Sequence, residues 1–360
     1  MLIVKLHGSL ENLGGIVTFQ KSLHGPNARS DNAYVHFQTG RVTTSRLRSV
    51  PLFRYLELAL SYMYFPLYLL YLNPDVIEIH SSIGQNSLRR DYWYARIASF
   101  VAPGARLLLF NHGWNDAVKH SLLKKNKPWL VKYFGLFDCI IVLADRFRRE
   151  INAMGVSTPV EVITTAIDLT EFADLPDDRS PERKRLLFLS RLEKEKGVSE
   201  LLDAVPALVA RYPDLEICIA GSGSYEDTAR IHPAVLAHSA NIRFLGYVRG
   251  HEKRDLLANS DLFIFPSYSE GCPISVIEAL AVGLPLVYTP VGALPDLLKS
   301  GRNGIQVNPG SSKDIEKATL QLLDNPGLMS GMAASNKELS KEFDLRVIHE
   351  KLERIYKGDS

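Results

Sequence analysis

The sequence is poor in cysteine, has no strong excess of either charge and contains no uninterrupted apolar run of membrane-spanning length. Its three cysteines, Cys139, Cys218 and Cys272, are too few and too scattered for a disulfide framework or a zinc cluster, which favours a reducing, cytoplasmic compartment. The 42 basic and 40 acidic side chains leave a formal net charge of +2, so the basic balance typical of a dedicated nucleic-acid-binding protein is absent.

Residues 51–72 form the one segment that approaches the length of a membrane span. Arg54, Glu57 and Pro66 interrupt it, so we expect a helix that is buried or lies at an interface rather than one that crosses a bilayer. The apolar run at the N-terminus is too short for a signal peptide and stops at a glycine, as the first strand of an α/β domain does.

Short apolar runs alternate with amphipathic segments along the whole chain. This pattern is typical of an α/β protein whose parallel sheets are covered by helices on both faces. With 360 residues, the chain has room for about two such domains. The expected strands lie at residues 1–8, 75–80, 106–113, 139–144, 185–191, 215–223, 242–247, 262–267 and 284–290.

A charged segment rich in Asp and Pro, residues 168–185, is typical of an exposed linker between the two halves. We therefore predict an N-terminal Rossmann-like domain over residues 1–170, a C-terminal one over residues 171–340 and a final helix over residues 341–360. That helix carries one apolar stripe and is expected to pack back on the N-terminal domain; the stripe consists of Leu345, Ile348, Leu352 and Ile355.

The most informative segment is residues 263–292, in which an expected strand ends at Ser267 and a helix begins near Ile274. Glu270 precedes this helix and Glu278 lies within it. Two carboxylates beyond the carboxyl end of a parallel strand suit a hydroxyl-rich ligand, because ionised oxygens accept strong hydrogen bonds from sugar hydroxyls. The alternative interpretation is a turn residue at Glu270 and a solvated helix charge at Glu278.

Two cations lie in the loop after another expected strand. Arg191 is at the carboxyl end of this strand and Lys196 comes just before the next helix, where both would clamp a diphosphate. A solvated loop of mixed charges is the alternative. The sequence contains no Asp-x-Asp pair, so no metal held by such a pair is expected, and the two cations together with helix N-termini would stabilise a leaving phosphate.

These motifs resemble glycosyltransferase family 4, the retaining nucleotide-sugar transferases with the GT-B fold, in which two Rossmann-like domains with parallel sheets face a central cleft. Glu270 and Glu278 resemble the family's E-x7-E motif, and Arg191 with Lys196 resembles its diphosphate-binding pair. Further similarities to family elements lie at Gly14-Gly15, at His112-Gly113, at Gly221-Ser222-Gly223 and at residues 242–248.

The resemblance implies a role for each of these residues. Glu270 would bind a hydroxyl of the transferred sugar, Glu278 the ribose hydroxyls, and His112 would lie beside the donor sugar. Arg191 and Lys196 would hold the diphosphate and stabilise its charge as it leaves. The remaining donor-binding residues would be Gly14, Gly15, Gly221, Val248, Gly271, Cys272, Pro273, Ile274 and Ser275.

The sequence departs from the family pattern at two places. Residues 164–168, Thr-Thr-Ala-Ile-Asp, replace the usual Pro-Asn-Gly before the interdomain aspartate. Cys272 stands where many relatives have an aromatic residue after Glu-Gly, and its small side chain would alter the sugar pocket.

The predicted function is retaining, metal-independent transfer of a hexose-type sugar from a UDP- or GDP-linked donor to a hydroxyl acceptor. The expected acceptor is a lipid-linked or polysaccharide intermediate of surface glycan biosynthesis; no cofactor and no nucleic acid is expected. The alternatives are a nucleotide-sugar epimerase, a phosphorylase on the same fold, or a non-catalytic nucleotide-sugar-binding module. A dehydrogenase is disfavoured because the first βα turn has the wrong glycine spacing.

The near-neutral total hides an uneven distribution of charge. Residues 1–170 contain 19 basic and 12 acidic side chains, a balance of +7, whereas the remainder contains 23 and 28, a balance of −5. Peripheral contact with the anionic inner face of the cytoplasmic membrane is therefore one expectation, and a solvated basic surface is the alternative. The basic clusters are Arg41, Arg46, Arg48 and Arg54, and Lys119, Lys124, Lys125, Lys127 and Lys132.

Overall fold

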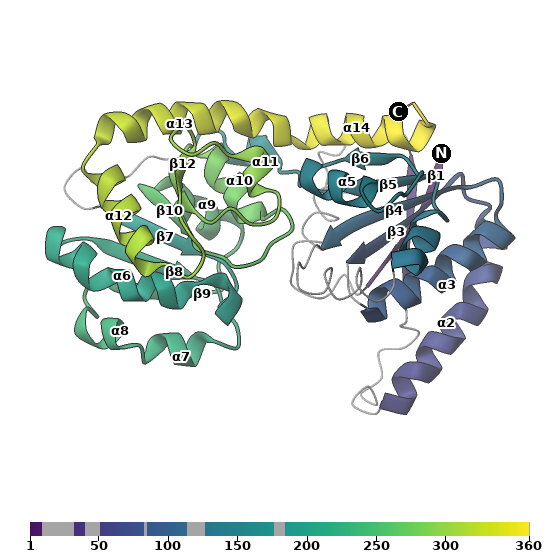
Figure 1. Cartoon of the computed structure of the whole chain (residues 1–360), viewed down its shortest axis with the longest axis horizontal. Coiled ribbons are helices and arrows are strands. Elements are labelled where there is room, and N and C mark those ends of the chain that lie inside the picture. Colours follow the sequence, from purple (N-terminus) through teal and green to yellow (C-terminus); the bar gives the residue numbers. More distant parts are fainter. Residues whose placement is uncertain (9–31, 40–50, 83–84, 114–126, 176–183, 360) are drawn as a thin grey trace. The chain divides into compact units, whose positions relative to one another are not determined.

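The computed structural model of the chain describes residues 1–8, 32–39, 51–82, 85–113, 127–175 and 184–359 (Figure 1). It divides into two compact units. Unit 1 comprises Met1–Thr164 and Arg346–Ser360, and unit 2 comprises Thr165–Leu345. The division thus falls a few residues before the domain boundary predicted after residue 170, and most of the last helix belongs to unit 1.

Unit 1 contains a six-stranded parallel sheet in the order β2-β1-β3-β4-β5-β6. Its strands are β1 (Leu2–His7), β2 (Ala33–Gln38), β3 (Val76–Ser82), β4 (Arg106–Gly113), β5 (Cys139–Val142) and β6 (Val160–Val162). Its helices include α2 (Pro51–Leu72), α3 (Gln85–Val101), α5 (Asp145–Asn152) and α14 (Leu345–Lys357).

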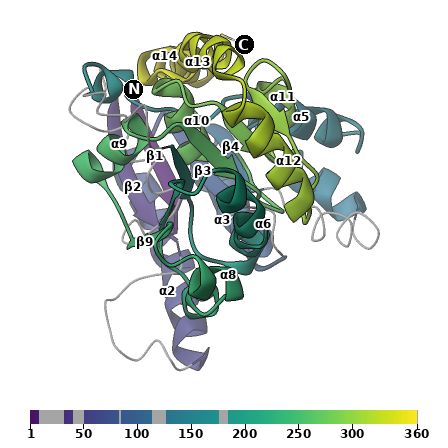
Figure 2. The same cartoon turned by 90° about the vertical axis from the view of Figure 1, so that its left-hand side faces the viewer.

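Unit 2 contains a second six-stranded parallel sheet, in the order β12-β11-β10-β7-β8-β9. Its strands are β7 (Arg185–Leu189), β8 (Glu216–Ala220), β9 (Ile242–Gly246), β10 (Leu262–Phe265), β11 (Leu286–Tyr288) and β12 (Gly304–Gln306). Its α-helices are α6 (Val198–Arg211), α7 (Glu226–Arg230), α8 (Pro233–Ala237), α9 (Gly250–Ala258), α10 (Ile274–Ala281), α11 (Leu294–Leu297), α12 (Ser312–Leu323) and α13 (Pro326–Ser340). Figures 1 and 2 show α6 and α8 on one face of this sheet and α9 and α10 on the other.

The predicted α/β class with two doubly wound parallel sheets is confirmed, and all nine expected strands are present. Three strands were not predicted, namely β2, β6 and β12. Each of them lies at the edge of its sheet, and β6 and β12 have only three residues. Strands β6 and β12 are too short to show an apolar run, and β2, although six residues long, has Phe37 as its one buried residue, so none of the three has the continuous apolar run that marks a central parallel strand.

None of the described residues in the segment predicted as an exposed linker, residues 168–175 and 184–185, is buried. Ile167 is buried and forms a parallel bridge with Asp344, and residues Leu169–Phe172 form a short 3-10 helix. The Asp168 side chain caps this turn by accepting a hydrogen bond from the Thr170 amide at 3.0 Å. Residues 176–183 lie outside the described part of the chain.

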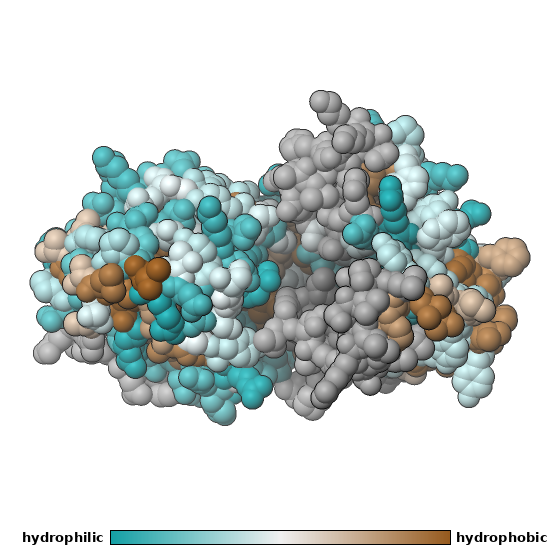
Figure 3. All heavy atoms as spheres, turned by 90° about the horizontal axis from the view of Figure 1, so that it is seen from below, coloured by the Kyte–Doolittle hydropathy of each residue, from teal (hydrophilic) through white to brown (hydrophobic). Residues whose placement is uncertain are grey.

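Among the described side chains of helix α2, those that are buried form one narrow row at the i, i+4 spacing of Glu57, Ser61, Phe65 and Leu69. Its solvent-facing side is apolar, and Figure 3 shows apolar atoms gathered at the end of the view where Figure 1 places α2. The apolar face of α2 consists of Tyr55, Leu56, Leu60, Met63, Tyr64, Leu67, Leu70 and Tyr71. Within the described segments, no helix has both the length and the hydropathy needed to cross a membrane.

Candidate active site

The loops that follow β7, β8, β10 and β11 pack against one another in unit 2. The Leu192 amide donates to the Ser222 carbonyl at 3.0 Å, and the Tyr268 amide donates to the Glu195 carbonyl at 2.9 Å. The Ala293 amide donates to the Gly271 carbonyl at 2.7 Å. Because the carboxyl ends of parallel strands share one edge of the sheet, the four loops form one layer there, where α/β proteins bind ligands.

Two glycines allow this close packing of loop backbones. Gly221 has φ +135°, and a Cβ atom at this position would lie 1.8 Å from the Ser190 carbonyl oxygen. Gly292 has φ +60°, and its Cβ would lie 2.4 Å from the Gly271 carbonyl oxygen. Both residues have a positive φ, which residues with a side chain rarely adopt, and neither position has room for a Cβ atom. Only glycine therefore fits at either position.

Lys196 and Glu270, which the sequence analysis placed in different motifs, form an ion pair. Lys196 Nζ lies 2.5 Å from Glu270 Oε1, and the side chains are 11% and 14% exposed. Ser267 Oγ lies 2.9 Å from the same Glu270 oxygen. The Glu270 carboxylate is therefore held on the edge of the sheet by a cation and a hydroxyl, while partial exposure leaves it accessible to a ligand.

Glu278 lies in the second turn of α10 and pairs with a different lysine. Its Oε1 accepts a hydrogen bond from Nζ of Lys253 on α9, which the motif analysis did not single out. Burial raises the pKa of Glu278, and Lys253 opposes this shift. Nothing in the local sequence links Lys253 to Glu278, because the two residues lie on separate helices and meet only in the fold.

The loop between Glu270 and α10 carries three of the predicted donor-binding residues, and the first two residues of α10 are a further two. Cys272 is buried, burial raises the pKa of its thiol, and its carbonyl accepts a hydrogen bond from Thr165 Oγ1 at 3.0 Å. Thr165 belongs to the segment that departs from the family pattern, so this segment holds the loop through a side-chain hydroxyl. Pro273 caps α10, whose first amides, at Ile274 and Ser275, have no acceptor within the helix.

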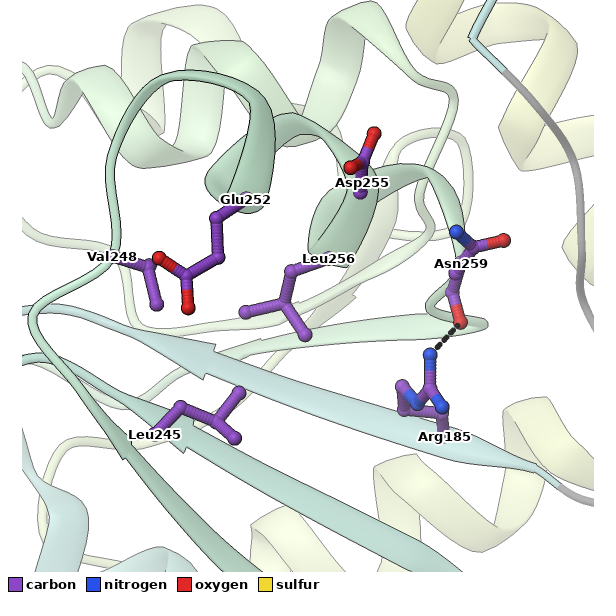
Figure 4. Close-up of a pocket in the computed structure, with 7 residues that line it drawn as sticks. All are labelled: Arg185, Leu245, Val248, Glu252, Asp255, Leu256 and Asn259. Carbon is purple, nitrogen blue, oxygen red and sulfur yellow. Dashed lines mark hydrogen bonds between the residues drawn. The ribbon is translucent and has the colours of Figure 1, made fainter.

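The other predicted residues of unit 2 lie in two places. Arg191 is exposed in the loop directly after β7, and Gly221 lies beside it in the loop after β8. Val248 is buried and lines a pocket of about 440 Å³ between α9 and the sheet (Figure 4). The other lining residues are Arg185, Leu245, Glu252, Asp255, Leu256 and Asn259.

His112 in unit 1 lies near the end of β4 and is half-buried. Its Nε2 is 2.7 Å from Nδ1 of His80 on the neighbouring strand β3, and burial lowers the pKa of both rings. Gly14 and Gly15 lie outside the described residues.

Two family models match nearly the whole chain. The model described as Glycosyltransferase Family 4 matches residues 16–171, and the model described as Glycosyl transferases group 1 matches residues 174–339. The phosphatidyl-myo-inositol mannosyltransferase of Mycolicibacterium smegmatis is 33% identical over 288 residues, which cover 78% of this chain and 70% of that protein. A glycogen synthase of Mycobacterium tuberculosis is 27% identical over 292 residues, which cover 79% of this chain and 68% of that protein.

Solved structures share the fold. The structure of Anabaena HepE in complex with UDP matches with a TM-score of 0.79 at 19% identity, covering 99% of this chain and 100% of that chain. Sucrose-phosphate synthase from Thermosynechococcus elongatus matches with a TM-score of 0.72 at 16% identity, covering 99% and 98%. Together with the family models, these similarities confirm the resemblance inferred from the motifs: the chain belongs to glycosyltransferase family 4 and is a group 1 glycosyltransferase with the GT-B fold.

Proposed function

We propose that this glycosyltransferase moves a hexose-type sugar from a UDP- or GDP-linked donor to a hydroxyl of a lipid-linked or polysaccharide acceptor, with retention of configuration and without a metal ion. The observation that carries the proposal is the Lys196–Glu270 pair at 2.5 Å. It joins the carboxylate of the E-x7-E motif to the lysine of the diphosphate motif in the loop layer of unit 2. The relatives named for phosphatidylinositol mannosyl transfer support a lipid acceptor.

Each charged group of this layer has a distinct task in the proposed reaction. Arg191 and Lys196 bind the diphosphate and stabilise its charge while the bond from the anomeric carbon to the phosphate oxygen breaks. Glu270 accepts a hydrogen bond from a hydroxyl of the transferred sugar, and Glu278 accepts hydrogen bonds from the ribose. A neutral His112 contacts the donor sugar.

The bond from the anomeric carbon to the acceptor oxygen forms on the face that the phosphate leaves, which preserves the configuration. The acceptor hydroxyl gives its proton to an oxygen of the departing phosphate, so no covalent enzyme intermediate and no separate base are required. The two cations supply the charge stabilisation that a metal supplies in other transferases. Full activity in excess EDTA supports metal independence, and activity restored only by a divalent cation contradicts it.

A phosphorylase or an epimerase differs from the proposed enzyme in what it consumes. Sugar transfer that depends on a hydroxyl acceptor supports the proposal, whereas turnover that depends on inorganic phosphate, or that inverts a sugar carbon without an acceptor, supports the alternatives. A non-catalytic binding module would bind the nucleotide without transferring or hydrolysing the sugar.

The identity of the donor can be tested by ligand-induced stabilisation of the full chain. At a ligand concentration of 100 times Kd, binding to the native state adds about 2.7 kcal/mol to the free energy of unfolding, which raises Tm by several degrees. We expect UDP or GDP, and the corresponding nucleotide sugar, to raise Tm more than ADP does. The matched control is Arg191→Ala, which should lose most of the shift because it removes a diphosphate contact. Equal shifts for all three nucleotides would leave no base preference and contradict a UDP- or GDP-specific donor site.

We further propose that unit 1 binds anionic membranes through the apolar face of α2. Eight large apolar side chains on this face are between 44% and 87% exposed, and three of them are tyrosines, which favour the polar-apolar boundary of a bilayer. The basic clusters of residues 1–170 would add attraction to anionic lipid; most of these clusters lie outside the described residues.

Vesicle co-sedimentation tests this contact. The full chain should bind vesicles that contain phosphatidylserine or phosphatidylinositol, and high salt or purely zwitterionic vesicles should weaken binding. Met63→Asp with Leu67→Asp should reduce binding at least about tenfold, since two charges must enter the interface. The matched control is Ile231→Asp, which charges an apolar residue of unit 2 that is 71% exposed. Binding that is indifferent to lipid charge, salt and both α2 substitutions would refute the contact.

A further inference from the structure

A file of polar side chains crosses the sheet of unit 1 beneath α14. Lys5 and Glu78 are directly paired in the register of β1 and β3, and Lys5 Nζ lies 3.4 Å from Glu78 Oε1. Because alternate residues of a strand share a face, His80 points to the same side as Glu78. His112 lies on this face too, two residues after Phe110, the partner of His80 in register. Four charged or titratable groups therefore meet inside a parallel sheet, where apolar residues are usual.

The contacts along this file are continuous from α14 to His112. Tyr356 Oη donates to Glu78 Oε2 at 2.7 Å, and Glu78 Oε1 lies 2.5 Å from His80 Nε2. His80 Nδ1 lies 2.7 Å from His112 Nε2. Lys5, Glu78 and His80 are each less than 5% exposed, so water competes little for these contacts.

The charge of Glu78 determines which ring nitrogens carry protons. Lys5 and the contacts with His80 and Tyr356 hold the pKa of Glu78 below its usual range despite burial, so its carboxylate is ionised. Because an ionised oxygen lies only 2.5 Å from His80 Nε2, this ring nitrogen must carry a proton. Burial lowers the pKa of His80, so the ring is neutral and its Nδ1 is an acceptor. His112, whose pKa burial and His80 also lower, must then donate from Nε2.

We infer that Glu78 and His80 are positioning residues that hold the His112 ring with its proton on Nε2 and its Nδ1 as a hydrogen-bond acceptor. Lys5 and Tyr356 fix the Glu78 carboxylate for this purpose. The ring plane is held as well, since Phe110 packs against His112 with ring centroids 4.2 Å apart. The use of this arrangement to the enzyme rests on the proposed function, in which His112 Nδ1 accepts a hydrogen bond from a hydroxyl of the donor sugar.

The state of His112 can be measured without any substrate. Long-range proton–nitrogen spectra of the full chain with 15N-labelled histidine distinguish the two neutral forms and the cation, and His112→Gln assigns the signal among the ten histidines. We expect His112 to be protonated at Nε2 alone at pH 7 and to stay neutral well below pH 6.5. A His112 ring protonated at Nδ1, or one that titrates near 6.5, overturns the inference.

Three variants test whether the file imposes this state. Glu78→Gln removes the ionised acceptor, and Tyr356→Phe removes one hydrogen bond while keeping the ring. In each variant, part of the population should have the neutral His112 ring protonated at Nδ1 instead of Nε2. Tyr62→Phe is the matched control, since Tyr62 Oη donates to the Arg90 carbonyl in the same unit, outside the file. An unchanged His112 spectrum in both Glu78→Gln and Tyr356→Phe would show that the file does not set the proton position.

Kinetics of the same variants give a second readout. Glu78→Gln should lower kcat at least about tenfold with little change in the KM for the donor, because it misdirects a hydrogen bond to the transferred sugar, and losing one group that stabilises the transition state costs up to about 10²- to 10³-fold. His80→Asn keeps an acceptor oxygen near the former Nδ1 and should retain more activity than His80→Leu. Equal losses in His80→Asn and His80→Leu would indicate a packing role. If the wild-type chain transfers no sugar while the spectra show the expected proton position, the proposed function fails and the positioning inference stands.

Discussion

Glu270→Gln and Lys196→Ala are each expected to lower kcat/KM by about 10²- to 10³-fold, the usual effect of removing one group that stabilises developing charge. Lys196 holds Glu270 at 2.5 Å, so each substitution removes a proposed substrate contact and also releases the partner. The double variant should therefore lose less than the product of the two single losses, because residues that act as a unit are not additive.

The matched control for these variants is Glu200→Gln. Glu200 accepts a hydrogen bond from Tyr268 Oη at 2.6 Å, so it contacts the same loop as Glu270 but belongs to none of the family motifs. The turnover rate of the Glu200→Gln variant should stay within a few-fold of the wild-type rate. Folding is checked by the Tm of each variant, and near-normal rates in folded Glu270→Gln, Lys196→Ala and Arg191→Ala variants would remove the basis of the proposed mechanism.

Lys5→Met is expected to produce the largest loss of stability, about 3–5 kcal/mol, because it leaves the Glu78 carboxylate buried without its cation. The Lys5 ammonium also lies over the rings of Tyr34 and Tyr356, at 4.9 and 5.7 Å from their centroids, so the substitution removes these contacts as well. Lys5→Met combined with Glu78→Gln should recover part of the loss, since no buried charge is then left unpaired. Urea unfolding of the three proteins measures these differences.

The loss in Lys5→Met should depend on pH in a defined direction. In the wild-type chain the pKa of Glu78 is lowered, so its contribution to stability is present above the ordinary glutamate pKa of 4.5 and declines as the pH falls below it. The difference between the two proteins should therefore be full at pH 7 and shrink below about pH 4.5. Arg211→Met is the control. The ion pair between Arg211 and Asp324 is exposed, so its loss should lower the free energy of unfolding by about 0–1 kcal/mol. A loss in Lys5→Met no larger than in Arg211→Met would contradict a buried ion pair.

The three strands that sequence reasoning missed all lie at a sheet edge, although the edge strand β9 was predicted. Central strands such as β5 and β10 are buried on both faces, so their residues read as apolar runs. The edge strands β2, β6 and β12 are paired on one side only, and what makes them strands is the neighbour that they pair with. Ile167 illustrates the same limit, since its bridge to Asp344 joins positions far apart in the chain.

The candidate site was predictable to the extent that its residues lie in local motifs. Glu270, Glu278, Arg191 and Lys196 were recognisable because each lies beside a strand end or helix start of a segment with a distinctive spacing. Lys253 was not, because its contact with Glu278 joins two helices. Thr165 was identified as a departure from the family pattern, but its hydrogen bond to the Cys272 carbonyl depends on tertiary packing.

The sequence by itself determined the parallel α/β class, the division into two halves and the family, because these depend on apolar periodicity and on motifs within a few residues of one another. Only the tertiary structure decided which charges pair: Lys196 with Glu270, Lys253 with Glu278, and Lys5 with Glu78. It also decided that Tyr356, 278 positions from Glu78, completes the file that ends at His112. The physical reason is that ion pairs and hydrogen bonds act over a few ångströms, and neither composition nor spacing specifies which distant residues the fold brings within that range.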